Sequence, residues 1–393
     1  MGFVLAALLG AVMHKTHFCT MGAVSDWVNM GATQRLRAWF LAIAVALLGV
    51  VIMESLGAVD FTETHPPYRS TQFAWLSQLL GGILFGVGMT LASGCISRNL
   101  VRLGEGSGKA LCVVIVIGLC VYALNDTPLS VFVQGLNAFS IELNRYGIAG
   151  QDLGSLFAAG LAADPKTCRL VIGLLLATVM LTLILSSREF RHHSNAVLSG
   201  SVLGLVVAEG WYLTGGLWGQ AWPIHGQGSN GADGVAQSYS FVEPLGELPA
   251  YLGQPENPLL LTPENPLLLT FGVVTIIGMT VGALLHAVIN KRFRWEWFSS
   301  WADFVRHLSG AILMGVGGVL AMGCTIGQGI TGVSTLALGS FLTLGAMILG
   351  SAAAMKVQYY KMLYEDASLL DALLSGLVDL RLLPRAVRRL EAL

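Results

Sequence analysis

Three cysteines in this sequence stand where an apolar helix is expected to break. Cys95 and Cys324 each follow a glycine at the end of a glycine-spaced apolar stretch, and Cys19 follows His17 and Phe18. A thiol buried at low dielectric stays protonated, which makes it a weak, soft hydrogen-bond donor. Three such groups in series are suited to pass a soft, sulfur-bearing anion along without holding it, whereas a buried Lys or Arg would hold a dianion too firmly.

The stretches that lead to Cys95 and Cys324 are copies of one sequence. GGILFGVGMTLASGCIS at 81–97 aligns without gaps with GAILMGVGGVLAMGCTI at 310–326, and 10 of the 17 positions are identical. A helix break exposes unpaired N–H groups and the positive end of a half-helix dipole, which suit an anion. Glycines beside the cysteines let the backbone approach a ligand closely. Broken helices that recur in the two halves of a chain indicate a transport site in a membrane.

The composition places these motifs in a membrane protein. The chain has 393 residues, of which 54% are hydrophobic and 11% are charged, whereas a soluble domain carries about 25% charged residues. Its mean hydropathy is +0.68. No basic segment precedes the first apolar run, so we expect this run to be retained rather than cleaved as a signal peptide. The net charge of −1 says nothing useful about partners, because the few charges lie at the ends of segments. We expect no nucleic acid among the partners.

Apolar segments of different lengths predict full spans and half-spans. A span needs about 20 residues, and residues 2–13 are too short. Together with a second short segment that ends near Met30, they predict two half-helices around a loop at 14–22. Residues 127–164 predict a partial or tilted helix and a polar loop. Full spans are expected at about 38–57, 109–124, 168–187, 267–290 and 340–355.

Basic residues indicate which ends of the spans face the cytoplasm. A basic run at 291–294 follows one span, whereas no Lys or Arg lies between Arg191 and that run. By the positive-inside rule, the acidic stretch at about 223–266 is an outer loop. It overlaps a tandem octamer, PENPLLLT, repeated over 255–270, to which we assign no function.

A weaker repeat divides the chain into two halves. Residues 9–22 align with 203–216, where Leu213 takes the place of Cys19. Each half would then contain a broken helix, a span and a Gly-Cys break, so that four breaks converge, one of them at Leu213. The predicted units are a first transmembrane half, a second pseudo-symmetric half and an amphipathic C-terminal surface helix, at 1–190, 191–361 and 362–393.

Other uses of the cysteines are less well supported. A disulfide between two of the three would leave the third unpaired. Soft thiolates select Cu(I), but Cu(I) carriers usually have Met or CxxC clusters, and the methionines here are scattered. A membrane sulfurtransferase, which would take up sulfur as a persulfide, needs a cysteine of low pKa, and only Cys19 has basic neighbours. The remaining cysteines, at 112, 120 and 168, lie in apolar helices and are expected to be core residues.

Polar residues near the breaks have ordinary explanations. His14 and His17 are expected to line the path or the membrane interface rather than to bind a ligand. Arg98 and Arg102 fit the positive-inside rule better than a vestibule.

Taken as a set, the three cysteine motifs closely resemble the YeeE/YedE family, in particular its thiosulfate-uptake members. The resemblance covers about residues 1–360 and rests on His17-Phe18-Cys19-Thr20-Met21-Gly22, Ser93-Gly94-Cys95, the Arg102, Gly104, Glu105 and Gly106 run, and Met322-Gly323-Cys324-Thr325-Ile326-Gly327. It implies a multi-pass inner-membrane permease of hourglass shape, in which thiosulfate passes a narrow centre by S–H hydrogen bonds. It also implies a small soluble sulfur-carrier protein as a cytoplasmic partner.

We therefore expect an all-α permease, not an enzyme, that imports thiosulfate or a related sulfur oxyanion through the lipid bilayer. Another sulfur or selenium species stays open, because the family also has members linked to selenium metabolism. We expect neither a cofactor nor a metal. The segment at 127–166, the long outer loop and the C-terminal helix depart from the family pattern. The residues expected to line the path are Cys19, Gly22, Gly94, Cys95, Gly323, Cys324 and Gly327.

Overall fold

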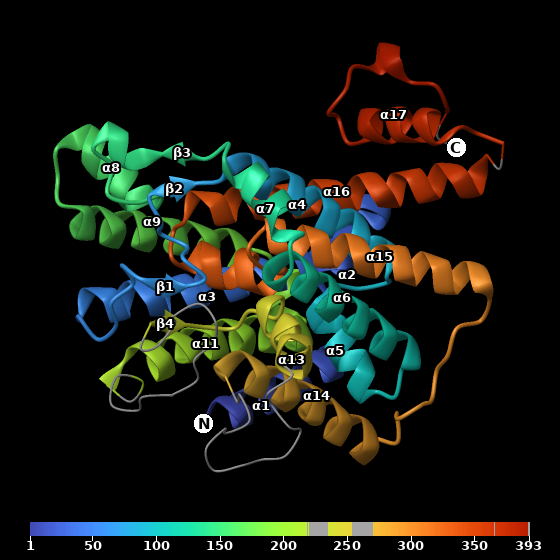
Figure 1. Cartoon of the computed structure of the whole chain (residues 1–393), viewed down its shortest axis with the longest axis horizontal. Helices are drawn as coiled ribbons and strands as arrows, with labels where there is room; N and C mark the ends of the chain where they lie inside the picture. The colour runs from blue at the N-terminus through green and yellow to red at the C-terminus, as the bar shows by residue number, and fades with distance from the viewer. Residues whose placement is uncertain (218, 220–234, 254–269, 365, 392–393) are drawn as a thin grey trace.

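Helices make up most of the protein, as the computed structural model shows (Figure 1). The structure describes residues 1–217, 219, 235–253, 270–364 and 366–391. Within these residues, 8 helical segments are long and apolar enough to cross a membrane. The predicted all-α, polytopic membrane fold is therefore confirmed.

The helices are, in chain order, α1 (Gly2–Thr16), α2 (Thr20–Met30), α3 (Gln34–Ser55), α4 (Trp75–Leu91), α5 (Ile96–Gly104), α6 (Gly108–Asp126), α7 (Ser130–Asn137), α8 (Leu153–Leu161), α9 (Pro165–Leu185), α10 (Arg188–His192), α11 (Ser194–Gly215), α13 (Glu243–Gly253), α14 (Phe271–Ile289), α15 (Trp301–Leu320), α16 (Leu338–Leu363) and α17 (Leu369–Asp379), with the short turns η1 (Leu143–Tyr146), η2 (Gly327–Gly332, a π-helix) and η3 (Arg385–Val387). The strands of the described part are very short. They form two ladders, in which β1 (Thr64–His65) pairs parallel with β4 (Ala236–Gln237) and β2 (Gln72–Phe73) pairs antiparallel with β3 (Ile141–Glu142).

The two glycine-spaced repeats pack against each other. α4 carries the first repeat, and it contacts both α15, which carries the second, and α16. A Cβ added at Gly81 would lie 2.8 Å from the carbonyl oxygen of Gly317, and one added at Gly88 would lie 2.7 Å from that of Gly310. No side chain fits at these distances. The glycine spacing therefore lets the two helix backbones touch, as small residues do between membrane helices.

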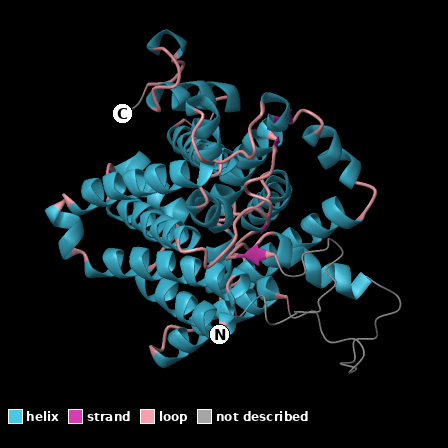
Figure 2. Cartoon of the chain, turned by 90° about the vertical axis from the view of Figure 1, so that its left-hand side faces the viewer, coloured by secondary structure: helices cyan, strands magenta, loops and turns pink. Residues whose placement is uncertain are grey.

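The predicted spans and half-spans are found in the structure. α3, α6, α9, α14 and α16 cover the five predicted full spans, and α1 and α2 are the two predicted half-helices. Short helices α7 and α8 lie within the segment predicted to be partly helical. α17 is the helix predicted in the tail, and it packs on α16 outside the main bundle (Figure 2). The division into two halves as a whole stays a prediction.

One prediction about the second half is wrong. No break occurs at Leu213, because α11 continues through it to Gly215. The stretch at 194–215 is apolar enough for one continuous helix, which packs along α3. Within the stretch predicted to be an outer loop, at 223–266, α13 forms and packs against α6; its position outside the membrane stays a prediction. The tandem octamer lies, apart from its last residue, outside the described residues.

Candidate functional site

Each of the three predicted cysteines stands at the start of a half-helix. Cys19 is the N-cap residue of α2 and Cys95 that of α5, and Cys324 precedes the helical segment that contains η2. In each case the backbone N–H three residues later faces the sulfur, and it belongs to Gly22, Arg98 and Gly327, respectively. Only the N–H of Gly327 donates a full hydrogen bond, to Cys324 Sγ at 3.4 Å. The side chains of Cys19 and Cys95 form no capping hydrogen bond.

The breaks before Cys95 and Cys324 have the same backbone shape. Ser93 has a φ of 57° and Met322 a φ of 55°, a left-handed conformation that few residues other than glycine adopt. The next residues, Gly94 and Gly323, both have a φ of 157°. The repeated sequence therefore builds the same chain reversal twice.

An amide side chain closes each of these two breaks. Asn99 Nδ2 donates to the carbonyl oxygens of Gly94 and Cys95 at 2.9 and 3.1 Å. Gln328 Nε2 donates to two carbonyl oxygens of the turn before Cys324, at 2.6 and 3.1 Å. Both amides lie four residues after their cysteine. They satisfy carbonyl groups of the broken helix that would otherwise lack a partner.

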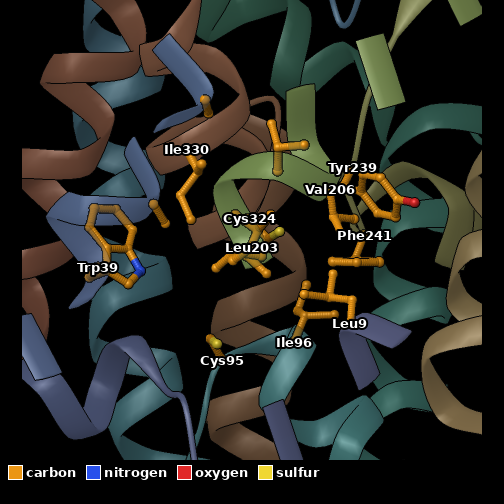
Figure 3. Packing of buried hydrophobic residues seen from close by; sticks show 14 of the residues in the cluster. Leu9, Trp39, Cys95, Ile96, Leu203, Val206, Tyr239, Phe241, Cys324 and Ile330 are labelled. Carbon is orange, nitrogen blue, oxygen red and sulfur yellow. The ribbon is translucent and has the colours of Figure 1, made fainter. Parts of the chain in front are cut away.

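The structure brings the three cysteines together in the protein interior. The exposed fractions of Cys19, Cys95 and Cys324 are 8%, 1% and 0%. The side chains of Cys19 and Cys95 interact directly, and Cys324 interacts electrostatically with Cys95. Cys95 Sγ also lies 3.2 Å from Ser97 Oγ. Figure 3 shows Cys95 and Cys324 within the buried apolar cluster, which includes Trp39.

None of the six cysteines, all of which lie in the described residues, forms a disulfide. Among the described residues, no group of three or more His, Cys, Asp or Glu side chains is placed to hold a metal ion.

A cavity of about 310 Å³ leads to the break before Cys324; we call it the outer cavity. Its lining includes the half-exposed pair His65 and Glu243 and the buried residues Ser240 and Gly323. Ser240 Oγ has no hydrogen-bond partner in the described part of the chain. An unpartnered hydroxyl therefore lies next to the Cys324 half-helix, on a residue that lines the cavity.

A second cavity of about 480 Å³ lies beside the Cys19 break; we call it the basic cavity. Its lining residues are His14, His17, Glu105, Lys291, Arg292 and Arg294. None of them lines the outer cavity. The order along the protein is therefore outer cavity, Cys324, Cys95, Cys19, basic cavity.

Buried charged side chains hold the segment that follows η2. Arg69 donates two hydrogen bonds to the Glu54 carboxylate, at 2.7 and 2.8 Å, and a third to the carbonyl oxygen of Thr335 at 3.1 Å. Arg169 bridges Glu54 at 3.1 Å and Asp152 at 2.8 Å. This cluster ties α3, α9 and two loops to the end of the Cys324 half-helix, which fixes its position.

A titratable pair stands in the wall of the outer cavity. His65 Nε2 lies 2.9 Å from Glu243 Oε2. Its hydrogen bond to the Glu243 carboxylate raises the pKa of His65 above its ordinary value of 6.5. The bond therefore favours the protonated form of His65 over the neutral one.

Sequence reasoning missed two residues that contact the Cys324 half-helix. Tyr68 Oη donates to the carbonyl oxygen of Gly327 at 2.7 Å. A Cβ added at Gly327 would lie 2.5 Å from Ser240 Oγ. Neither residue belongs to a repeat or a motif, since both come from loops that only the folded chain brings to the site. The seven predicted path residues, by contrast, all lie at or beside the three breaks.

Sequence comparisons relate most of this chain to known proteins. The family model described as "Sulphur transport" matches residues 15–353. The thiosulfate transporter TsuA of Spirochaeta thermophila is 26% identical over 354 residues, which cover 89% of this chain and 96% of the relative. The thiosulfate transporter TsuA of Escherichia coli is 24% identical over 362 residues, which cover 89% of this chain and 91% of the relative.

Proposed function

This chain belongs to the sulphur transport family, and we propose that it imports thiosulfate, or a related sulfur oxyanion, across the inner membrane. One observation carries the proposal most strongly. Three thiols, each at the positive end of a half-helix, meet in the interior between two cavities that share no lining residue. Names of the two relatives support thiosulfate as the substrate.

Transport would proceed along the line of cysteines. The anion enters the outer cavity, where the Ser240 hydroxyl is available as a donor, and then meets the thiols of Cys324, Cys95 and Cys19 in turn. Each S–H donates a weak hydrogen bond to the anion, and the N–H groups of the half-helix add a positive potential. Because each contact is weak, the anion can leave as readily as it arrives.

The glycines at the breaks would keep the constriction narrow and leave the backbone accessible. A Cβ added at Gly94 would lie 3.0 Å from the Arg98 side chain, and one at Gly323 would lie 3.1 Å from that of Gln328. One at Gly22 would lie 2.9 Å from Arg35 Nη1. We propose these positions, with Gly327, as parts of the path.

On the cytoplasmic side, we propose that a small sulfur-carrier protein takes over the released anion. The basic residues around the second cavity support this side as the cytoplasmic one. The proposed role is transport alone, with no covalent sulfur chemistry on the cysteines.

Uptake of thiosulfate by cells that lack other importers tests the proposal. Cys95→Ala and Cys324→Ala are expected to abolish uptake of labelled thiosulfate. Cys168→Ala is the matched control, since Cys168 lies in α9 away from the breaks, and it should transport normally. Full uptake by both site variants would refute the line of thiols.

Two further measurements separate the alternatives. Competition by sulfate, sulfide and selenite in proteoliposomes would identify the anion carried. A persulfide on Cys19 that forms only during turnover, detected by mass spectrometry, would instead support a sulfurtransferase.

A further inference from the structure

Two histidines share a proton at the wall of the basic cavity. His14 Nδ1 on α1 lies 2.7 Å from His286 Nδ1 on α14, and their rings meet edge to face. At this distance one nitrogen must donate and the other must accept. Protonating both Nδ1 atoms would place two N–H donors face to face. The intact pair therefore carries one positive charge at most.

The pair is connected to the Cys95 break. His14 Nε2 lies 3.6 Å from Glu105 Oε1, and Arg98 Nη1 lies 3.2 Å from the same oxygen. The Arg98 side chain in turn covers Gly94, the residue before Cys95. Three contacts in series, from His14 to Glu105, from Glu105 to Arg98 and from Arg98 to the Cys95 break, thus connect the histidines to the thiols.

The cavity itself has an excess of positive charge. Lys291, Arg292 and Arg294 line it, and none of them forms an ion pair within the described part of the chain. Glu105 is the one acidic residue in the lining, and Arg98 already neutralises it. A volume of about 480 Å³ accommodates a small oxyanion with some of its water.

Charged groups approach the pair from α1 itself and from two of the helices packed on it. Lys15 and His17 come from α1 and its end, Arg98 and Glu105 from α5, and Arg292 follows α14. The remaining helix in contact with α1 is α11. Its ionisable residues, Glu209 and Tyr212, lie near its C-terminal end, whereas the basic residues Arg188 and Arg191 precede its N-terminal end.

We propose that the basic cavity is a binding site for small divalent oxyanions, and that protonation of the His14–His286 pair controls how tightly it holds them. The proposal rests on the proposed function only for the identity of the anion that arrives from Cys19. Fixed cations attract the anion, and a proton on the pair adds one charge. A protonated imidazole loses its proton as the pH rises, so the added charge is withdrawn and the anion is released.

The basic cavity binds anions according to their charge, and not according to whether they carry a soft sulfur atom. No thiol lines the basic cavity, so sulfate should bind there as well as thiosulfate does. Sulfate is therefore a probe for this cavity that does not depend on passage through the cysteines.

The test is equilibrium binding of labelled sulfate to the purified full-length protein over a pH series from pH 5 to pH 8. We expect binding about tenfold tighter at the acid end of the series, which corresponds to about 1.4 kcal/mol. Arg292→Ala, a change at an exposed residue, should weaken sulfate binding at both pH values. His286→Asn should preserve binding but weaken its pH dependence, because one imidazole of the pair is lost. Cys168→Ala, a change in α9 outside the cavity lining, should leave both unchanged.

The outcomes distinguish this inference from the proposed function. Sulfate binding that is independent of pH, or unaffected by Arg292→Ala, overturns the inference even if thiosulfate uptake depends on the cysteines. Conversely, pH-dependent sulfate binding together with normal uptake by Cys95→Ala and Cys324→Ala would refute the line of thiols and leave the basic cavity as proposed. Size-exclusion profiles confirm that each variant is folded.

Discussion

Replacing Ser240 by Ala is expected to impair transport without harming stability. Ser240 Oγ is buried and has no partner among the described residues. An unpaired buried hydroxyl costs about 1–3 kcal/mol, so its removal should leave the free energy of unfolding unchanged or raise it by up to that amount. If the hydroxyl donates to the anion in the outer cavity, its loss removes a hydrogen bond to a charged group, worth about 1.5–3 kcal/mol. The KM for thiosulfate should then rise by about tenfold or more.

Ser238 provides a matched control in the same segment. It is also buried, but its Oγ donates to the carbonyl oxygen of Val207 at 2.7 Å. Ser238→Ala breaks a satisfied hydrogen bond, so it should lower stability by about 1 kcal/mol and leave the KM unchanged.

The measurements are thermal unfolding of the purified proteins and initial rates of thiosulfate uptake. If Ser240→Ala is destabilised as much as Ser238→Ala, its hydroxyl has a structural partner and the reasoning fails. An unchanged KM would show that the hydroxyl does not contact the anion.

Three further predictions concern the scaffold. Asp152→Ala leaves the buried Arg169 without one carboxylate partner, so the midpoint of thermal unfolding should fall, by an amount equivalent to about 3 kcal/mol or more. Gly317→Ala should cost about 1–3 kcal/mol in unfolding experiments, because the added Cβ would lie 2.5 Å from a backbone nitrogen of α4, whereas Gly345→Ala, with open space at its Cβ, should be neutral. Glu243 raises the pKa of His65 above 6.5. The stability that this pair contributes is therefore fully present below pH 6.5 and is lost as the pH rises through the raised pKa. A pH series of unfolding midpoints should show this loss in the unmodified protein but not in Glu243→Gln.

The features that could be predicted from the sequence are local ones. The breaks at Cys95 and Cys324 are encoded by a short repeat, and the residues that shape each break lie within a few positions of the cysteine. Spans are visible because the bilayer demands long apolar segments. Both the repeat and the apolar spans can be recognised in the sequence without any knowledge of tertiary contacts.

The features that could not be predicted depend on distant parts of the chain. Ser240 reaches the site because the segment after β4 lies against η2, and no periodicity marks it. The His14–His286 pair joins residues 272 positions apart. The prediction of a helix break at Leu213 is wrong because it rests on a weak sequence match, whereas packing against α3 favours an unbroken α11.

Cysteine at the start of a half-helix has a physical consequence that explains why serine is a poor substitute. Helices elsewhere in the chain begin with oxygen caps, such as Asp164, Thr270 and Ser300, which accept the backbone N–H at 3.0, 3.2 and 3.1 Å. Sulfur is a weaker acceptor, and the bond at Cys324 is 3.4 Å long. The N–H groups are thus left partly free for an anion.

A serine at this position would cap its own helix instead. Cys324→Ser should therefore raise the stability of the protein by about 0.5–2 kcal/mol, the value of a good N-cap, while thiosulfate uptake falls. The same preparations used for Ser240→Ala provide both readouts. If Cys324→Ser is neither more stable than the unmodified protein nor slower in thiosulfate uptake, the sulfur only fills space. A more stable but inactive variant would mean that the protein gives up helix stability at the constriction so that the backbone can interact with what passes.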